Sequence, residues 1–286
     1  MEKQERKSRL ILLLAFFLTL TAIGLLAGAM SSDEWVYAEI QQLNRSPSPS
    51  PESSRAGADE PGYASHGLFK GKFVPPGNIL RVQHSVDLTC NASTRICRYD
   101  AFDPRDGHLY YVESNSYASI NLAEFCEKTS QATGILEHPG EPSFWLWIST
   151  VIFLSLAILF ALFAAIATLV NVIYVPISDI AGIQGVYVWN AIASLSTLTT
   201  LCIWAGMYYS HLRYNILPVI VIGWGGTTCG LAYHGNAVWI ILAALLIFIL
   251  NIAVIRCRRG VSSVRHPGRA IYVKGHAKDG HDTTYY

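Results

Sequence analysis

The main pattern along the chain is an alternation of long apolar runs with polar segments. The runs at 10–30, 144–175, 186–209 and 237–255 contain no Asp, Glu, Lys, Arg or His. Each run is close to, or longer than, the roughly 20 residues that a helix needs to cross the hydrocarbon core of a bilayer. A cleaved signal peptide is the alternative for the first run, but its apolar part would extend over only about 7–15 residues. We therefore predict four transmembrane helices.

The polar segments between the runs define a topology. Basic residues are concentrated before the first run and directly after the fourth, and the positive-inside rule then places both termini in the cytosol. The predicted order between the spans is a cytosolic N-terminus at 1–9, a large extracellular loop at 31–143, a cytosolic turn at 176–185, a second extracellular loop at 210–236 and a cytosolic tail at 256–286.

The large loop predicts a small β-rich domain, so the fold class is a membrane all-α four-helix bundle with a β-rich extracellular part. Residues 46–61 are rich in Ser and Pro and bury too little apolar surface to become ordered, which predicts a flexible insertion. The segment Trp35–Ile40 suits either the membrane interface or a first strand. Further strands are predicted at 67–73, 79–88 and 108–113, and a short helix at 117–128.

Composition narrows the possible functions. The chain is 51% hydrophobic and 14% charged with a formal net charge of +1, which favours a membrane environment and gives no reason to expect a nucleic-acid partner. Spans without ionisable residues disfavour proton relays, voltage sensors and transporters of charged substrates. No nucleophile motif, phosphate-binding loop or metal-ligand spacing is present, so we expect neither an enzyme nor a cofactor.

We assign structural roles to the amides within the spans and no site to the histidines outside them. The amides in the spans predict hydrogen bonds between helices, because polar side chains join helices in a membrane. They are Asn171, Asn190 and Asn251. Histidines at 84, 108 and 138 could meet in the ectodomain, but we interpret them as unrelated surface residues.

Three of the six cysteines and both glycosylation sequons fall in the large loop. Cys90 and Cys97 are close enough to bridge a hairpin or tight loop, and we predict a disulfide between them. Cys126 and Cys229 either pair with each other or remain buried thiols. Asn91 and Asn44 each begin an Asn-x-Ser sequon and are predicted glycosylation sites.

Contact sites are predicted in the first span and in the tail. Gly24 and Gly28 form Gly-x-x-x-Gly, which lets another helix approach closely, and we expect them to pack inside the bundle. The tail is predicted to be disordered, with Cys257 as a palmitoylation candidate beside a cluster of arginines. The final residues, Thr284, Tyr285 and Tyr286, resemble a ligand of PDZ domains, which bind a free carboxylate by strand addition.

Two short motifs, one in the large loop and one at the start of the third span, resemble segments of a known family of membrane proteins. The first lies in the large loop and is similar to the Gly-Leu-Phe-x-Gly segment of clarins; its residues are Gly67, Leu68, Phe69 and Gly71. The second begins the third span and is similar to Gly-x-x-Gly-x-Tyr of clarins; its residues, with the proline before it, are Pro176, Gly182, Gly185 and Tyr187. The resemblance covers all four spans in order.

The resemblance implies a claudin-like, non-enzymatic plasma-membrane protein that organises or maintains actin-based or synaptic membrane structures in sensory or neural cells. It implies scaffold and cadherin-type partners, and we expect a PDZ scaffold or actin-linked proteins to bind the tail. A homo-oligomer is compatible with the sequence. The alternatives are a claudin-like adhesion or barrier protein, and an auxiliary subunit of a channel or receptor such as the stargazin-like proteins.

Overall fold

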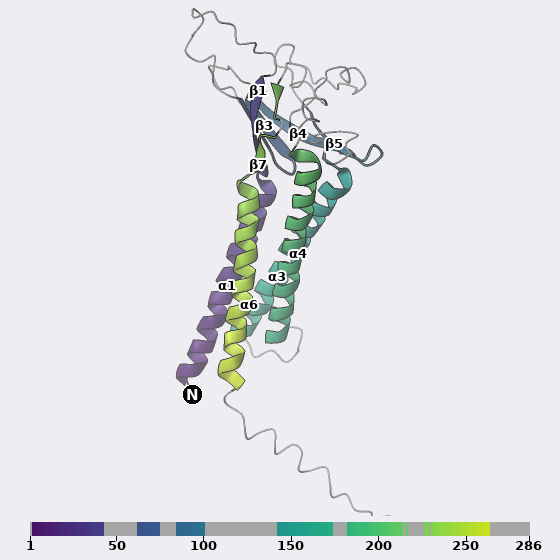
Figure 1. The fold of residues 1–286 in the computed structure, drawn as a ribbon. Coiled ribbons are helices and arrows are strands. Elements are labelled where there is room, and N and C mark those ends of the chain that lie inside the picture. Colours follow the sequence, from purple (N-terminus) through teal and green to yellow (C-terminus); the bar gives the residue numbers. More distant parts are fainter. Residues whose placement is uncertain are drawn as a thin grey trace, which may run out of the picture.

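Long helices form the body of the molecule. In the part of the chain that the computed structural model describes, four of them lie side by side with a small sheet at one end (Figure 1). They are α1 (Glu2–Ser31), α3 (Phe144–Ile173), α4 (Ile183–Met207) and α6 (Asn236–Ser263). All four are long and apolar enough to cross a membrane, which is the architecture of a multi-pass membrane protein. The described residues are 2–42, 62–74, 84–100, 142–173, 182–213, 216, 226–228 and 230–263.

The helices pack through small residues. Helix α1 contacts α3 and α6, and α4 contacts the same two neighbours. Lipid tails are as apolar as leucine, so membrane helices gain little by burying large apolar side chains and instead approach closely at small ones. Many large side chains accordingly point outward, as with Phe17 and Leu195, which are 61% and 64% exposed, although others such as Phe248 are buried. The buried small residues include Ala15, Ala22, Ala157, Ala161, Ala193 and Ala244.

Gly24 and Gly28 do not pack inside the bundle, so that expectation was wrong. At about 100° per residue, the glycines lie on the opposite side of α1 from its buried face. A Cβ added at either glycine would meet no atom within 4 Å. The Gly-x-x-x-Gly spacing shows which residues share a helix face, but not which face meets a neighbour. The buried face of α1 consists of Leu12, Ala15, Thr19, Ala22, Leu26 and Ala29.

An antiparallel sheet covers one end of the bundle. Its described strands follow the order β5-β4-β3-β2-β1-β6, and β7 also pairs with β1. Strand β1 therefore joins strands of both loops into one sheet. The first loop supplies β1 (Val36–Gln42), β2 (Gly62–His66), β3 (Lys70–Val74), β4 (His84–Asn91) and β5 (Ile96–Asp100), and the second supplies β6 (Gly226–Thr227) and β7 (Ala232–His234).

The strand predictions were correct in part. Of the two alternatives for Trp35–Ile40, the structure contains the strand, and β4 covers the described part of 79–88. Residues 67–73 do not form one strand as expected, because residues 67–69 make a tight turn in which the Gly67 N–H donates to the Lys70 carbonyl at 2.8 Å. The predictions for 46–61, 108–113 and 117–128 lie outside the described residues.

Two boundaries also differ from the prediction. Helical structure after α4 continues through a π-helical turn, η1 (Tyr208–Leu212), and the second loop then contributes β6 and β7. Strands this short carry no readable alternation and are stable only when paired. Residues 256–263, which we assigned to a disordered tail, continue α6 instead. Arginine is a good helix former, and a single glycine does not stop a helix that is already nucleated.

The sheet and the bundle share one hydrophobic core. The side chain of Trp35, between α1 and β1, is fully buried, and its indole Nε1 donates to the Ala29 carbonyl at 2.8 Å. Its ring meets Trp204 of α4 edge to face at 4.6 Å between centroids. Alternate residues of β1, Val36, Ala38 and Ile40, are buried in the same cluster. The sheet is therefore seated on the helices.

Candidate functional site at the joint between sheet and helices

The first motif forms the turn between β2 and β3 and leaves no room for side chains at its two glycines. A Cβ on Gly67 would lie 2.2 Å from the Ser32 carbonyl oxygen, and one on Gly71 would lie 2.4 Å from Nδ1 of His66. Real Cβ atoms do not approach other atoms so closely. Glycine is therefore required at both positions by contact with the end of α1 and with the neighbouring strand.

The middle of the same turn joins the sheet to α3. Leu68 is fully buried, and its carbonyl accepts a hydrogen bond from the Trp147 indole at 2.7 Å. The Phe69 ring meets Trp147 edge to face, and the Phe69 carbonyl accepts from the Leu88 N–H of β4 at 2.8 Å. Trp147 belongs to the aromatic start of the second span, and in the structure it bonds to the sheet.

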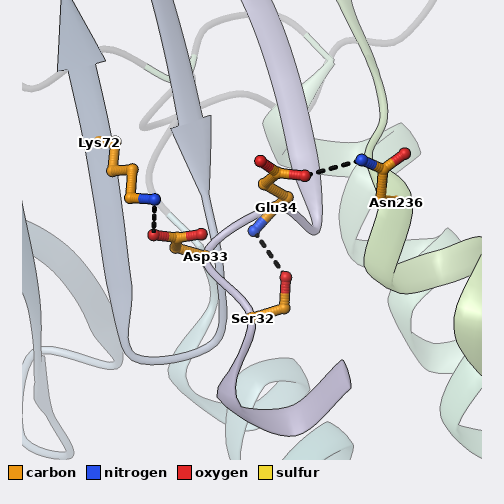
Figure 2. A network of polar contacts seen from close by, with 5 residues as sticks. All are labelled: Ser32, Asp33, Glu34, Lys72 and Asn236. Atoms are coloured by element: carbon orange, nitrogen blue, oxygen red, sulfur yellow. Dashed lines mark hydrogen bonds and ion pairs between the residues drawn. The ribbon is translucent and has the colours of Figure 1, made fainter. Parts of the chain in front are cut away.

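The segment that leaves α1 connects three elements (Figure 2). The Glu34 N–H donates to the Ser32 hydroxyl at 3.1 Å, which closes a turn. The Asp33 carboxylate contacts the Lys72 ammonium of β3 at 2.6 Å, and the Glu34 carboxylate accepts from the Asn236 amide at the start of α6 at 2.8 Å. The hydrogen bond to Asp33 raises the pKa of Lys72.

Backbone contacts bring the second loop to the same segment. The Gly235 N–H donates to the Trp35 carbonyl at 2.9 Å, and a Cβ on Gly235 would lie 2.2 Å from the backbone carbonyl oxygen of Glu34. The Tyr208 hydroxyl donates to the Ala232 carbonyl at 2.6 Å. The exits of α1 and α4 and the start of α6 are thus held together around β1.

Two histidines that the sequence did not single out lie at this joint. His66 is fully buried, and its Nε2 bonds to the Ile216 carbonyl, so Nε2 carries the proton of the neutral ring. Burial lowers the pKa of His66 to about 4. The His234 ring lies against Tyr208 in a tilted contact, at 4.0 Å between centroids, and burial lowers the pKa of His234 as well. Both rings are therefore uncharged at neutral pH. The sequence alone could not separate them from surface histidines, because the residues that bury them are distant in the chain.

A row of tyrosine rings crosses the opposite face of the sheet. Tyr37 of β1 stacks between Tyr63 of β2 and Tyr233 of β7, at 5.8 and 5.6 Å between centroids. We call these three residues and Glu39 the tyrosine row. Glu39 lies two residues after Tyr37 on the same face and opposite Tyr63. Burial, and then Glu39, raises the pKa of Tyr37 and of Tyr233.

The hairpin of β4 and β5 contains the predicted disulfide. Cys90 and Cys97 are cross-strand partners and are bonded to each other. Asn91 is exposed beside them, and its side-chain oxygen accepts from the Ser93 N–H and hydroxyl, so this sequon is accessible. The Cys97 N–H donates to the Pro142 carbonyl at 2.9 Å, which covers the edge of β5. The predictions for Asn44, Cys126 and Cys229 lie outside the described residues.

The second motif lies at the other end of the bundle. Gly182 precedes α4 with extended backbone and Gly185 is buried. The Tyr187 hydroxyl accepts a hydrogen bond from the Arg256 guanidinium at 3.1 Å, and the guanidinium lies 5.5 Å from the ring centroid. Cys257 is an exposed free thiol beside this pair. Pro176 and the C-terminal residues Thr284, Tyr285 and Tyr286 lie outside the described residues.

Within the bundle, one amide joins three helices. The Asn251 side chain of α6 donates to the Thr19 hydroxyl of α1 at 2.8 Å and to the Asn190 oxygen of α4 at 2.9 Å. All three side chains are fully buried. Asn171 instead donates to the Ala167 carbonyl of its own helix. The predicted role between helices is therefore confirmed for Asn190 and Asn251 in the described contacts.

The described residues contain no group of three or more His, Cys, Asp or Glu side chains that could hold a metal ion. The chain matches no protein-family model and no curated protein. What the geometry offers is a rigid joint between an extramembrane sheet and a helical bundle, together with an exposed aromatic and acidic sheet face. These features suit binding and structural organisation.

Proposed function

We propose that this chain is a non-enzymatic membrane protein of the claudin-like superfamily, similar to the clarins, that organises or maintains specialised plasma-membrane and actin structures in sensory or neural cells. The observation that carries the proposal is the turn at Gly67 and Gly71. Two residues of the clarin resemblance, Gly67 and Gly71, occupy positions where a Cβ would clash with its surroundings. The resemblance therefore concerns positions on which the architecture depends.

Chemistry at the two ends of the bundle supports an orientation. The Cys90–Cys97 disulfide and the exposed sequon at Asn91 suit an oxidising, glycosylating compartment at the sheet end. The start of α1 and the end of α6 lie together at the opposite end (Figure 1), where basic residues follow Ile255. Basic flanks favour the cytosol. We expect the sheet outside the cell and both termini inside.

In this proposal the tail recruits the anchoring partners. Its arginines suit anionic lipid, Cys257 suits an acyl chain, and Thr284–Tyr286 suits a PDZ scaffold linked to actin. Weak contacts on one tether can together retain a protein through their effective concentration. The ectodomain would set placement and stability at the surface.

The test is a truncation in neural or sensory cells with actin-based protrusions. Ending the chain after Ser263 keeps the whole of α6 and removes the PDZ-type end. In the same variant, Cys257→Ser, Arg258→Gln and Arg259→Gln remove the acylation candidate and most of the arginine cluster, which lie within α6. We expect this variant to reach the surface normally and to lose its concentration in protrusions, whereas removal of Thr284–Tyr286 alone should cause part of the loss. Full retention of the truncated protein in protrusions would contradict the proposal.

Expression of the unaltered protein in epithelial cells separates this proposal from the two alternatives, a barrier protein and an auxiliary subunit. A barrier protein would form strands at contacts and raise transepithelial resistance. An auxiliary subunit would co-purify with a channel or receptor. We expect neither effect from this chain alone.

A further inference from the structure

The tyrosine row has an open surface and a rigid arrangement. Tyr233 is 44% exposed although it stacks on Tyr37, and Glu39 is exposed beside it. The three rings come from three paired strands, two of the first loop and one of the second. A tyrosine held in this way loses little conformational freedom when a partner binds, and such residues carry much of the binding energy in protein interfaces.

The charge beside the row is negative. Glu39 accepts a hydrogen bond from the Tyr233 side chain and makes no ion pair with any described residue, whereas Lys72, a lysine on this face, is paired with Asp33 at 2.6 Å. Glu34 adds a second carboxylate near Tyr37, and burial together with these acids raises the pKa of that tyrosine. A partner here must therefore bring positive charge.

The geometry of the rings selects the kind of cation. Adjacent rings are tilted by only 22° and 29°, so each covers the inner face of its neighbour and the row presents ring edges and hydroxyls. A quaternary ammonium headgroup requires converging ring faces that form a cage. Long basic side chains instead lay their methylene stems on apolar surface and extend the charge to its edge.

We propose that the tyrosine row binds a Lys- or Arg-bearing segment in the extracellular part of another protein, with the stem packed on the tyrosines and the charge on Glu39. This inference deepens the proposed function by giving the chemistry of an extracellular partner, and it rests on that function only in placing the sheet outside the cell.

The test measures direct binding to the purified full-length protein in nanodiscs of a zwitterionic lipid. The probe is a fluorescent peptide of alternating Arg and Gly, and its control is the same peptide with citrulline, an uncharged isostere, in place of Arg. We expect the Arg peptide to bind and the citrulline peptide to bind at least about fivefold more weakly, as removal of a central contact does in protein interfaces. No cell is involved, so loss of the proposed cellular function would not affect this result.

Matched variants locate the site. Glu39→Gln should weaken binding about fivefold and Tyr233→Ala about tenfold. Asp87→Asn removes the same charge from an exposed acid elsewhere on the sheet, where Asp87 lies 4.0 Å from Lys70, and should change binding less than about twofold. The conservative Tyr233→Phe keeps the stack, removes only the hydrogen bond of the hydroxyl to Glu39, and should fold as the unaltered protein does.

Three results would overturn the inference. Equal weakening by Glu39→Gln and Asp87→Asn would mean general attraction to an acidic surface. Unchanged binding in both Glu39→Gln and Tyr233→Ala would exclude the row. Displacement of the peptide by an equal concentration of soluble phosphocholine, with the same dependence on Glu39, would identify a lipid headgroup as the occupant instead of a protein segment.

Discussion

Two regions of the molecule are held together in different ways. One is the joint between the sheet and the bundle, and the other is the half of the bundle farther from the sheet, which we call the inner half. At the joint, glycines pack against backbone with no space for a methyl group, and two indoles donate hydrogen bonds to carbonyls. In the inner half, small side chains line the contacts and Asn251 connects three helices. The joint depends on shape and tolerates little change, whereas the inner half depends on several weak contacts and should tolerate the loss of one.

The largest effect is expected from Gly67→Ala. The added methyl group would lie 2.2 Å from the Ser32 carbonyl oxygen, so backbone must move, and we expect a loss of about 3 kcal/mol or more in stability. The measurements are the thermal midpoint of the detergent-purified protein and the fraction at the cell surface. Gly28→Ala, where no atom lies within 4 Å, is the control and should be nearly neutral. Equal behaviour of both variants would mean that the turn is not tightly packed.

Acid should weaken the joint more than the inner half. The pKa of His66 is about 4 in the folded protein against an ordinary value of 6.5, so the unfolded chain binds the proton more readily. The contribution of His66 to the free energy of unfolding is therefore fully present above pH 6.5. It declines as the pH falls towards 4, by on the order of 3 kcal/mol. His234 acts in the same direction because its pKa is also lowered.

The variant His66→Gln tests this pH dependence. Glutamine can donate a hydrogen bond to Ile216 but does not titrate. The thermal midpoint of this variant should depend less on pH between 6.5 and 4 than that of the unaltered protein. Identical slopes for the two proteins would remove His66 as the cause.

The smallest effect is expected from Asn251→Leu. The change removes two hydrogen bonds to Thr19 and Asn190, and bonds of this kind between membrane helices contribute about 0.6 kcal/mol on average and at most about 1.7. We expect a loss of about 1 kcal/mol, measured as a small decrease in the thermal midpoint in detergent. Thr199→Val is the control, because this exposed hydroxyl bonds only to its own helix. A greater loss in the control would contradict the role of Asn251.

The sequence predicted more of the structure in the bundle than at the joint. The spans were predictable because each helix satisfies its own backbone and needs only a long apolar run. The Cys90–Cys97 bridge was predictable because its partners are seven residues apart. Strands β6 and β7 were missed because they are too short to show a pattern, and the role of His66 was missed because its partner Ile216 is 150 residues away.

By itself the sequence determined four apolar helices and a Cys90–Cys97 bridge, because these depend on local composition and short separations, and it left Trp35–Ile40 open between a strand and the membrane interface. Only the tertiary structure decided which face of α1 meets its neighbours, that Gly67 lies against backbone and Gly71 against the His66 ring, and that the three tyrosines form one row. Each of these depends on segments far apart in the chain that come together only when both loops pair with β1.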